Sequence, residues 1–171
     1  MDIKFQDQQP ERIKAGLLAV PVREKQLDGP VIRRLDRLLH GGLVERIKKS
    51  QFTGAEGASL SYSTAGRIPA ANLALIGLGK TEEINADSWR KAGARARKEA
   101  AALGAEEVGF FFAPEKESET AAGAVAEGVH DLPLALHLVV DVLLDLRGGV
   151  LDHGPVGGID APDAQRLHAA Q

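Results

Sequence analysis

Apolar runs separated by amphipathic stretches follow one another along the first 129 residues of the chain. The runs at 16–22 and 108–112 are apolar at almost every position, which is typical of strands covered on both faces. Residues 59–64 instead alternate with period two, as in a half-buried strand. The pattern predicts strands at 3–5, 16–22, 59–64, 72–78 and 108–112.

Amphipathic helices are predicted between these strands. Asp28 is expected to cap the first, with Pro30 in its first turn and Gly41 near its end, and Asn85 to cap a longer one that Gly104 ends. The remaining expected helices span 43–49 and 119–129, and the longer one spans 86–103. The apolar stripes are Val31, Ile32, Leu35, Leu38 and Leu39 in the first helix, and Trp89, Ala92, Ala96, Ala100 and Leu103 in the longer one.

Strands that alternate with helices predict an α/β fold in which helices cover both faces of a sheet. The neighbouring strands at 59–64 and 72–78 resemble a hairpin, so the sheet is expected to be mixed rather than purely parallel. The side chains expected to be buried together in the core are Leu18, Val20, Leu35, Leu75, Ile76, Val108 and Phe111.

Length and composition are those of one globular domain, with 171 residues, 44% hydrophobic and 26% charged. The formal net charge of −3 and the absence of a basic block argue against a nucleic-acid partner. The absence of cysteine excludes disulfides and thiolate metal sites. The first residues lack the apolar stretch of a signal peptide and the most apolar window, 132–146, is too short to span a bilayer, so we expect a cytoplasmic protein without a membrane anchor.

The charged residues change abruptly after residue 129. Residues 1–129 carry nine Lys, ten Arg, 13 Glu and five Asp, whereas 130–171 carry no Lys or Glu, two Arg, six Asp and four of the five His. This change predicts a domain at 1–129 and an atypical tail at 130–171. The simplest explanation of the tail is a shifted reading frame or a truncated gene, and the alternative is a genuine tail of different sequence. Only 132–146 is apolar enough to fold, and we expect it to form a helix that covers the domain without joining the sheet.

Residues 77–81 place two glycines, a lysine and a threonine directly after a predicted strand. A P-loop requires another glycine five residues before this Gly-Lys-Thr, and that position is Ala74. The helix also begins too late to direct its amino end at a phosphate. We therefore interpret the segment as a strand-to-helix connection.

Other candidate motifs also have simpler structural explanations. Gly54 and Gly57 fit a loop that leads into a strand, and residues 110–112, three phenylalanines, fit a buried strand better than a stacking platform. No Gly-x-Ser-x-Gly or His-Glu-x-x-His motif is present in the sequence. Four tail residues at helical spacing could together bind a metal ion: His130, His137, Asp141 and Asp145. The favoured interpretation is that they form the polar stripe of an amphipathic segment.

Five segments in order resemble the amino-terminal domain of the leucyl aminopeptidases, a family of cytosolic two-metal enzymes that form hexamers. They are residues 16–20, the helix end at 41–42, the strand at 73–80, the helix start at 88–92 and the run at 121–128. The resemblance implies a macro-domain-like fold, with a mixed sheet between two helix layers. It also implies that the metals, their ligands and the catalytic residues belong to a carboxy-terminal domain, whose signature Asn-Thr-Asp-Ala-Glu-Gly-Arg-Leu does not occur here.

We therefore expect no catalytic, cofactor-binding or metal-binding residue in this chain. The favoured hypothesis is a non-catalytic amino-terminal domain of a leucyl aminopeptidase-like metallopeptidase, inactive alone, whose parent family uses two divalent ions such as zinc or manganese. Its expected partners are the catalytic domain and further copies of the chain. The alternative is a free-standing macro-like module that binds a nucleotide-type ligand through the backbone amides of Gly77 to Gly79.

Overall fold

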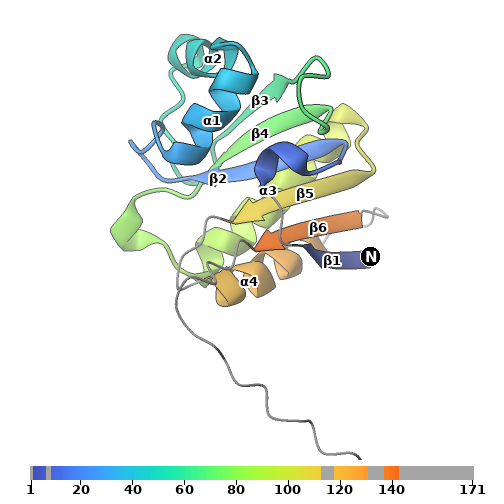
Figure 1. The fold of residues 1–171 in the computed structure, drawn as a ribbon. Helices are drawn as coiled ribbons and strands as arrows, with labels where there is room; N and C mark the ends of the chain where they lie inside the picture. The colour runs from blue at the N-terminus through green and yellow to red at the C-terminus, as the bar shows by residue number, and fades with distance from the viewer. Residues whose placement is uncertain (1, 7–8, 113–117, 131–136, 143–171) are drawn as a thin grey trace, which may run out of the picture.

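A six-stranded sheet forms the centre of the molecule (Figure 1). The computed structural model describes residues 2–6, 9–112, 118–130 and 137–142. The elements in chain order are β1 (Asp2–Gln6), η1 (Pro10–Arg12), β2 (Leu17–Val22), α1 (Pro30–Leu38), α2 (Gly42–Ser50), β3 (Ser59–Ser63), β4 (Asn72–Gly77), η2 (Thr81–Glu83), α3 (Ala86–Leu103), β5 (Glu107–Phe112), α4 (Ser118–His130) and β6 (His137–Val142). All five strands and all four helices predicted from residues 1–129 are present.

The sheet is mixed, as predicted. Its strand order is β1-β6-β5-β2-β4-β3, and neighbouring strands are parallel except for the antiparallel pair β3 and β4. Helices α1 and α2 pack on one face, and α3 and α4 pack on the other (Figure 1). The result is the three-layer α/β arrangement expected for a macro-domain-like fold.

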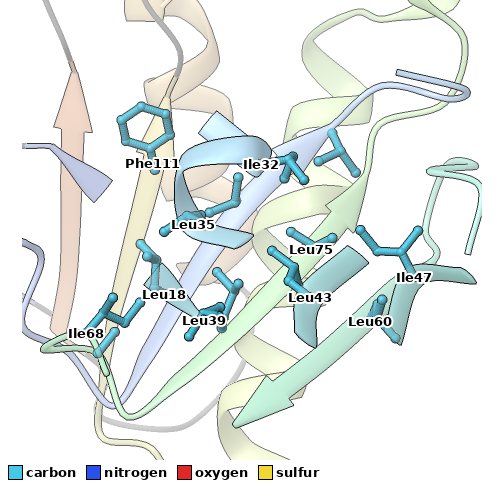
Figure 2. Close-up of a cluster of buried hydrophobic side chains, with 14 of the residues drawn as sticks. Leu18, Ile32, Leu35, Leu39, Leu43, Ile47, Leu60, Ile68, Leu75 and Phe111 are labelled. Carbon is cyan, nitrogen blue, oxygen red and sulfur yellow. The ribbon is translucent and has the colours of Figure 1, made fainter. Parts of the chain in front are cut away.

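Both faces of the central strands are buried under helices. Since successive side chains of a strand point to opposite faces, the core is divided into two clusters. Leu18, Leu75 and Phe111 pack with α1 and α2 (Figure 2), and Val20 and Leu35 join the same cluster. The expectation that all seven core residues lie together is wrong for two of them. Ile76 and Val108 are fully buried on the opposite face, against α3 and α4.

Two details of the helices also differ from the predictions. The N-cap of α1 is Gly29, which makes no side-chain capping bond, and Asp28 instead accepts a hydrogen bond from Arg33 Nη2 at 3.2 Å. Leu103, predicted on the buried face of α3, is 42% exposed because it lies in the last turn, beyond the sheet-facing alanines. In contrast, the predicted Asn85 cap is confirmed by bonds from Asp87 N and Ser88 N.

Strand β6 contradicts the prediction that residues from the tail stay outside the sheet. It pairs in parallel with β1 from Asp2↔His137 to Gln6↔Asp141, and with β5 from Glu107↔His137 to Phe112↔Val142. Three of its six residues are valine, which favours a strand when partners are available on both sides. The sheet thus extends past residue 129. Residues 131–136 and 143–171 lie outside the described part of the chain, and both the boundary at 129 and the origin of the tail stay predictions.

Glycine allows α3 and α4 to pack closely. A Cβ on Gly128 would lie 1.9 Å from the carbonyl oxygen of Arg90, and one on Gly93 would lie 2.4 Å from that of Val125. Both distances are far below van der Waals contact, and backbone atoms cannot rotate away. Gly123, on the same helix α4, would meet no atom within 4 Å.

We expect Gly128→Ala to lower the free energy of unfolding by about 1–3 kcal/mol, because the helices must move apart to admit the methyl group. Gly123→Ala is the matched control and should raise it by up to about 1 kcal/mol, the gain in helix propensity. Chemical denaturation of both variants measures the difference. Equal effects of the two substitutions would show that α3 and α4 are not in backbone contact.

Candidate functional site at the carboxyl ends of β2 and β5

The sheet changes its winding direction between the neighbouring strands β2 and β5. The chain leaves β2 through α1 on one face and continues to β3 and β4, whereas it leaves β5 through α4 on the other face and continues to β6. In open α/β sheets, ligands bind outside the carboxyl ends of the strands at such a point. The topology therefore indicates where a site would lie.

Pro21 lies where the hydrogen bonding between β2 and β5 ends. The carbonyl of Val22 accepts a hydrogen bond from Leu78 N at 2.9 Å, so the backbone of Val22 faces β4. Pro21, one residue earlier, faces β5 by alternation and has no N–H to donate. The pairing of β2 with β5 accordingly ends at Ala19↔Phe110, whereas the pairing with β4 continues to Val22↔Gly77.

A crevice of about 200 Å3 opens beyond the last β2–β5 pair. Its walls come from the end of β2 (20–22), the first turn of α1 (30–32), the end of β5 (111–112) and Trp89 of α3. Trp89 packs on Phe112, with ring centroids 5.5 Å apart and planes inclined by 39°. Among the described residues that line it, the polar side chains are Arg23 and Gln26, and none is a carboxylate, imidazole or hydroxyl.

The backbone amides of Gly77 to Gly79 are already bonded within the protein. They donate to the carbonyls of Ala58, Val22 and Gly54 at 2.8, 2.9 and 3.1 Å, respectively. In this structure these amides are thus not free to hold the nucleotide-type ligand of the alternative hypothesis. A Cβ on Gly77 would lie 2.0 Å from the carbonyl oxygen of Ala55, so this glycine is required for contact with the neighbouring loop.

The other groups of residues 77–81 also point to a structural connection. Lys80 Nζ donates a hydrogen bond to Glu83 at 3.0 Å, and this bond is the main cause that raises the pKa of Lys80. Thr81 begins the short helix η2, and α3 starts only at Ala86. The interpretation of this segment as a strand-to-helix connection is confirmed.

The glycines at 54 and 57 belong to the loop that leads into β3, as predicted. Gly54 has a φ of 81°, and a Cβ there would lie 2.7 Å from the carbonyl oxygen of Arg23. Gly57 N donates to the carbonyl of Gly77 at 3.2 Å. Hydrogen bonds from Glu24 N to the carbonyl of Gly79 at 2.8 Å and from Gly79 N to the carbonyl of Gly54 at 3.1 Å also join the loops after β2 and β4 to the loop before β3.

The three phenylalanines of β5 are buried, which confirms their interpretation as core. Phe110 and Phe112 lie on the face of α3 and α4, and Phe111 on the face of α1. Phe111 and Phe112 also form the end of the strand that lines the crevice. Neither Trp89 nor Pro21 is predicted from the sequence as part of this site, although a proline inside a buried strand is a signal of interrupted pairing.

The candidate metal residues of the tail do not lie on one helix face. His137 and Asp141 are in strand β6, where four residues span about 13 Å. His130 is in α4, and Asp145 lies outside the described residues. The described part of the chain contains no group of three or more His, Cys, Asp or Glu that could hold a metal ion.

Comparison with known proteins agrees with this architecture. A macrodomain of Trypanosoma brucei, solved in complex with ADP, superposes with a TM-score of 0.65 at 14% identity, over 84% of this chain and 64% of that one. A tomato leucine aminopeptidase variant superposes with a TM-score of 0.69 at 21% identity, over 84% of this chain and 32% of that one. Both likenesses define the fold class, a macro-domain-like three-layer α/β domain.

The sequence assigns the domain to a family within that class. Residues 19–133 match the "Cytosol aminopeptidase family, N-terminal domain", and the chain belongs to this family. A probable cytosol aminopeptidase of Alkaliphilus metalliredigens (strain QYMF) is 30% identical over 132 residues, which are 75% of this chain and 26% of the relative. The chain thus spans about a quarter of the length of that relative. Across the described residues, no helix is long and apolar enough to cross a membrane.

Proposed function

We propose that the chain is a non-catalytic amino-terminal domain of a leucyl aminopeptidase-like metallopeptidase, and that it is inactive alone. The observation that carries the proposal is the match of residues 19–133 to the amino-terminal domain of the cytosol aminopeptidase family. The parent activity is the release of amino-terminal residues from peptides. In this proposal, two divalent ions in the catalytic domain activate water and polarise the scissile carbonyl.

The described residues do not fit the metal centre of such an enzyme. They bring no three metal-ligating side chains together, and the crevice between β2 and β5 has a mainly apolar lining. No step of peptide hydrolysis is therefore assigned to the described residues. Its proposed contribution is a folded domain that contacts the catalytic domain and other copies of the protein.

A hybrid protein tests this contribution. In the Alkaliphilus metalliredigens relative, the 132 aligned residues are replaced by the corresponding segment of this chain. We expect the hybrid to hydrolyse a leucyl amide in the presence of manganese and to have the same molar mass in solution as the unmodified relative. The relative without any amino-terminal domain is the control, and a hybrid that behaves like this control would contradict the proposal.

A second candidate function, a module that binds a small ligand, is favoured by one observation. The crevice lies at the switch point of the sheet, where α/β proteins hold ligands, and it is lined by aromatic and apolar side chains. The Trypanosoma brucei macrodomain, which has the same fold, was solved in complex with ADP. A ligand bound by this chain must be held by groups other than the amides of 77–79, which are already bonded.

A further inference from the structure

The size of the crevice limits what it can hold. Its volume of about 200 Å3 is below the roughly 300–1,000 Å3 of pockets that enclose drug-sized ligands. One fused ring system fits such a space, whereas a dinucleotide would extend far beyond it. The volume therefore favours a small group.

The walls favour an aromatic group over an aliphatic one. Trp89 is half-buried, lines the crevice and packs on Phe112, and Pro30 and Phe111 also line the crevice. Aromatic side chains bind ring systems by stacking, and this interaction accepts different rings because each has a π-face. Stacking on this wall thus requires a ligand with a flat ring but does not specify the substituents of the ring.

The rim offers groups for a polar ring edge. Gln26 is exposed at the crevice, and its Nε2 donates to Thr81 Oγ1 at 3.2 Å. A carboxamide carries both donors and an acceptor, the combination that pairs with ring nitrogens and exocyclic amines. A heteroaromatic ring would use this group, whereas a plain hydrocarbon ring would leave it unused.

Among the described residues near the crevice, the groups that could bind a phosphate are already engaged within the protein. The backbone amides of 77–79 donate hydrogen bonds to carbonyls of the protein and not to a phosphate. The nearby Lys80 is hydrogen-bonded to Glu83. Arg23, the cation among the described lining residues, already has an interaction partner within the protein. The described lining residues thus form no cluster of backbone amides or cations around an anionic group.

We propose that the crevice between β2 and β5 binds a neutral planar heteroaromatic ring of about the size of a purine base, stacked on Trp89. This proposal deepens the second candidate function and rests on it. It is independent of the role of the domain in an aminopeptidase. The proposed binding differs from that of a nucleotide binder that depends on contacts with the phosphate.

Trp89 provides the readout, because it is the one tryptophan in the sequence. The full chain is titrated with adenine, with adenosine monophosphate and with inorganic phosphate while tryptophan fluorescence is recorded. We expect saturable quenching by adenine, a dissociation constant for adenosine monophosphate within about threefold of that for adenine, and no response to phosphate.

Two substitutions locate the binding. Val31→Phe places a larger side chain in the crevice and should weaken adenine binding at least tenfold, roughly the effect of 1.4 kcal/mol. Val44→Phe is the matched control, because Val44 is also half-buried on a helix but does not line the crevice, and should leave binding unchanged. Thermal melting of both variants checks that they fold. Gln26→Ala, at an exposed position, should weaken binding about three- to tenfold, independently of folding.

The outcomes separate the hypotheses. Binding that requires the phosphate of adenosine monophosphate, or that survives Val31→Phe in a folded variant, would overturn the neutral-ring proposal and leave a ligand-binding module in place. Absence of saturable quenching by any probe would overturn both. Neither result would affect the proposed role as an aminopeptidase domain, which the hybrid protein tests.

Discussion

Ending the chain after Val129 is expected to unfold the domain, with a loss of more than about 5 kcal/mol, comparable to the whole stability of a typical domain. The cut removes β6, which lies between β1 and β5 in the sheet. Strand β1 then has no neighbour, and β5 becomes an exposed edge. Far-UV circular dichroism during a thermal melt measures the effect.

A chain that ends after Val142 is the control for this cut, because it retains all six strands of the sheet. We expect its melting temperature to stay close to that of the full chain. The chain that ends after Val129 could instead melt at the same temperature as the chain that ends after Val142 and the full chain. In that case β6 does not stabilise the sheet, and the change in composition at residue 129 marks the true end of the domain.

Replacing Phe111 with alanine should lower the free energy of unfolding by about 3–5 kcal/mol, the usual cost of deleting a core aromatic side chain. Phe111 is 3% exposed and packs in the cluster with Leu18 and Leu35 (Figure 2). Urea denaturation measures the loss. Leu103→Ala is the control, because Leu103 is 42% exposed, and should cost less than about 0.5 kcal/mol. A loss below about 1 kcal/mol for Phe111→Ala would mean that β5 does not direct this side chain into the core.

Local patterns were sufficient to predict the elements of the first 129 residues. The central strands are parallel and covered on both faces, so their sequences are apolar at nearly every position. Helix α3 has an asparagine cap and a glycine end, and both limits were predicted at the observed residues. The distribution of side chains between the two faces was missed, because the core was expected to be one cluster although the pleat of each strand divides it between two helix layers.

Strand β6 was missed because its pairing is entirely non-local. Its histidine and aspartate, four residues apart, were interpreted as one face of a helix, whereas its valines favour a strand. Its partners, β1 and β5, lie more than a hundred and about thirty residues earlier in the chain, respectively. A single sequence does not show that these two strands leave a position open between them.

The crevice could not be predicted because it depends on the sheet topology and on loops that are distant in sequence. The glycines of residues 77–79 suggested a place for a ligand, but the direction of a backbone amide is set by its tertiary partners. Pro21 was visible in the sequence, yet its effect depends on which neighbour its missing N–H would have faced. Trp89 was predicted as a buried residue of α3, and only the position of α3 beside β5 brings it to the crevice.

The most direct test of the central claim, that this chain is a non-catalytic domain, is an aminopeptidase assay of the purified full chain. Leucyl p-nitroanilide is incubated with the chain in the presence of manganese or zinc, and the release of p-nitroaniline is followed. We expect no release above that of the metal alone. Release that follows the chain through purification and disappears with a chelator would contradict the claim.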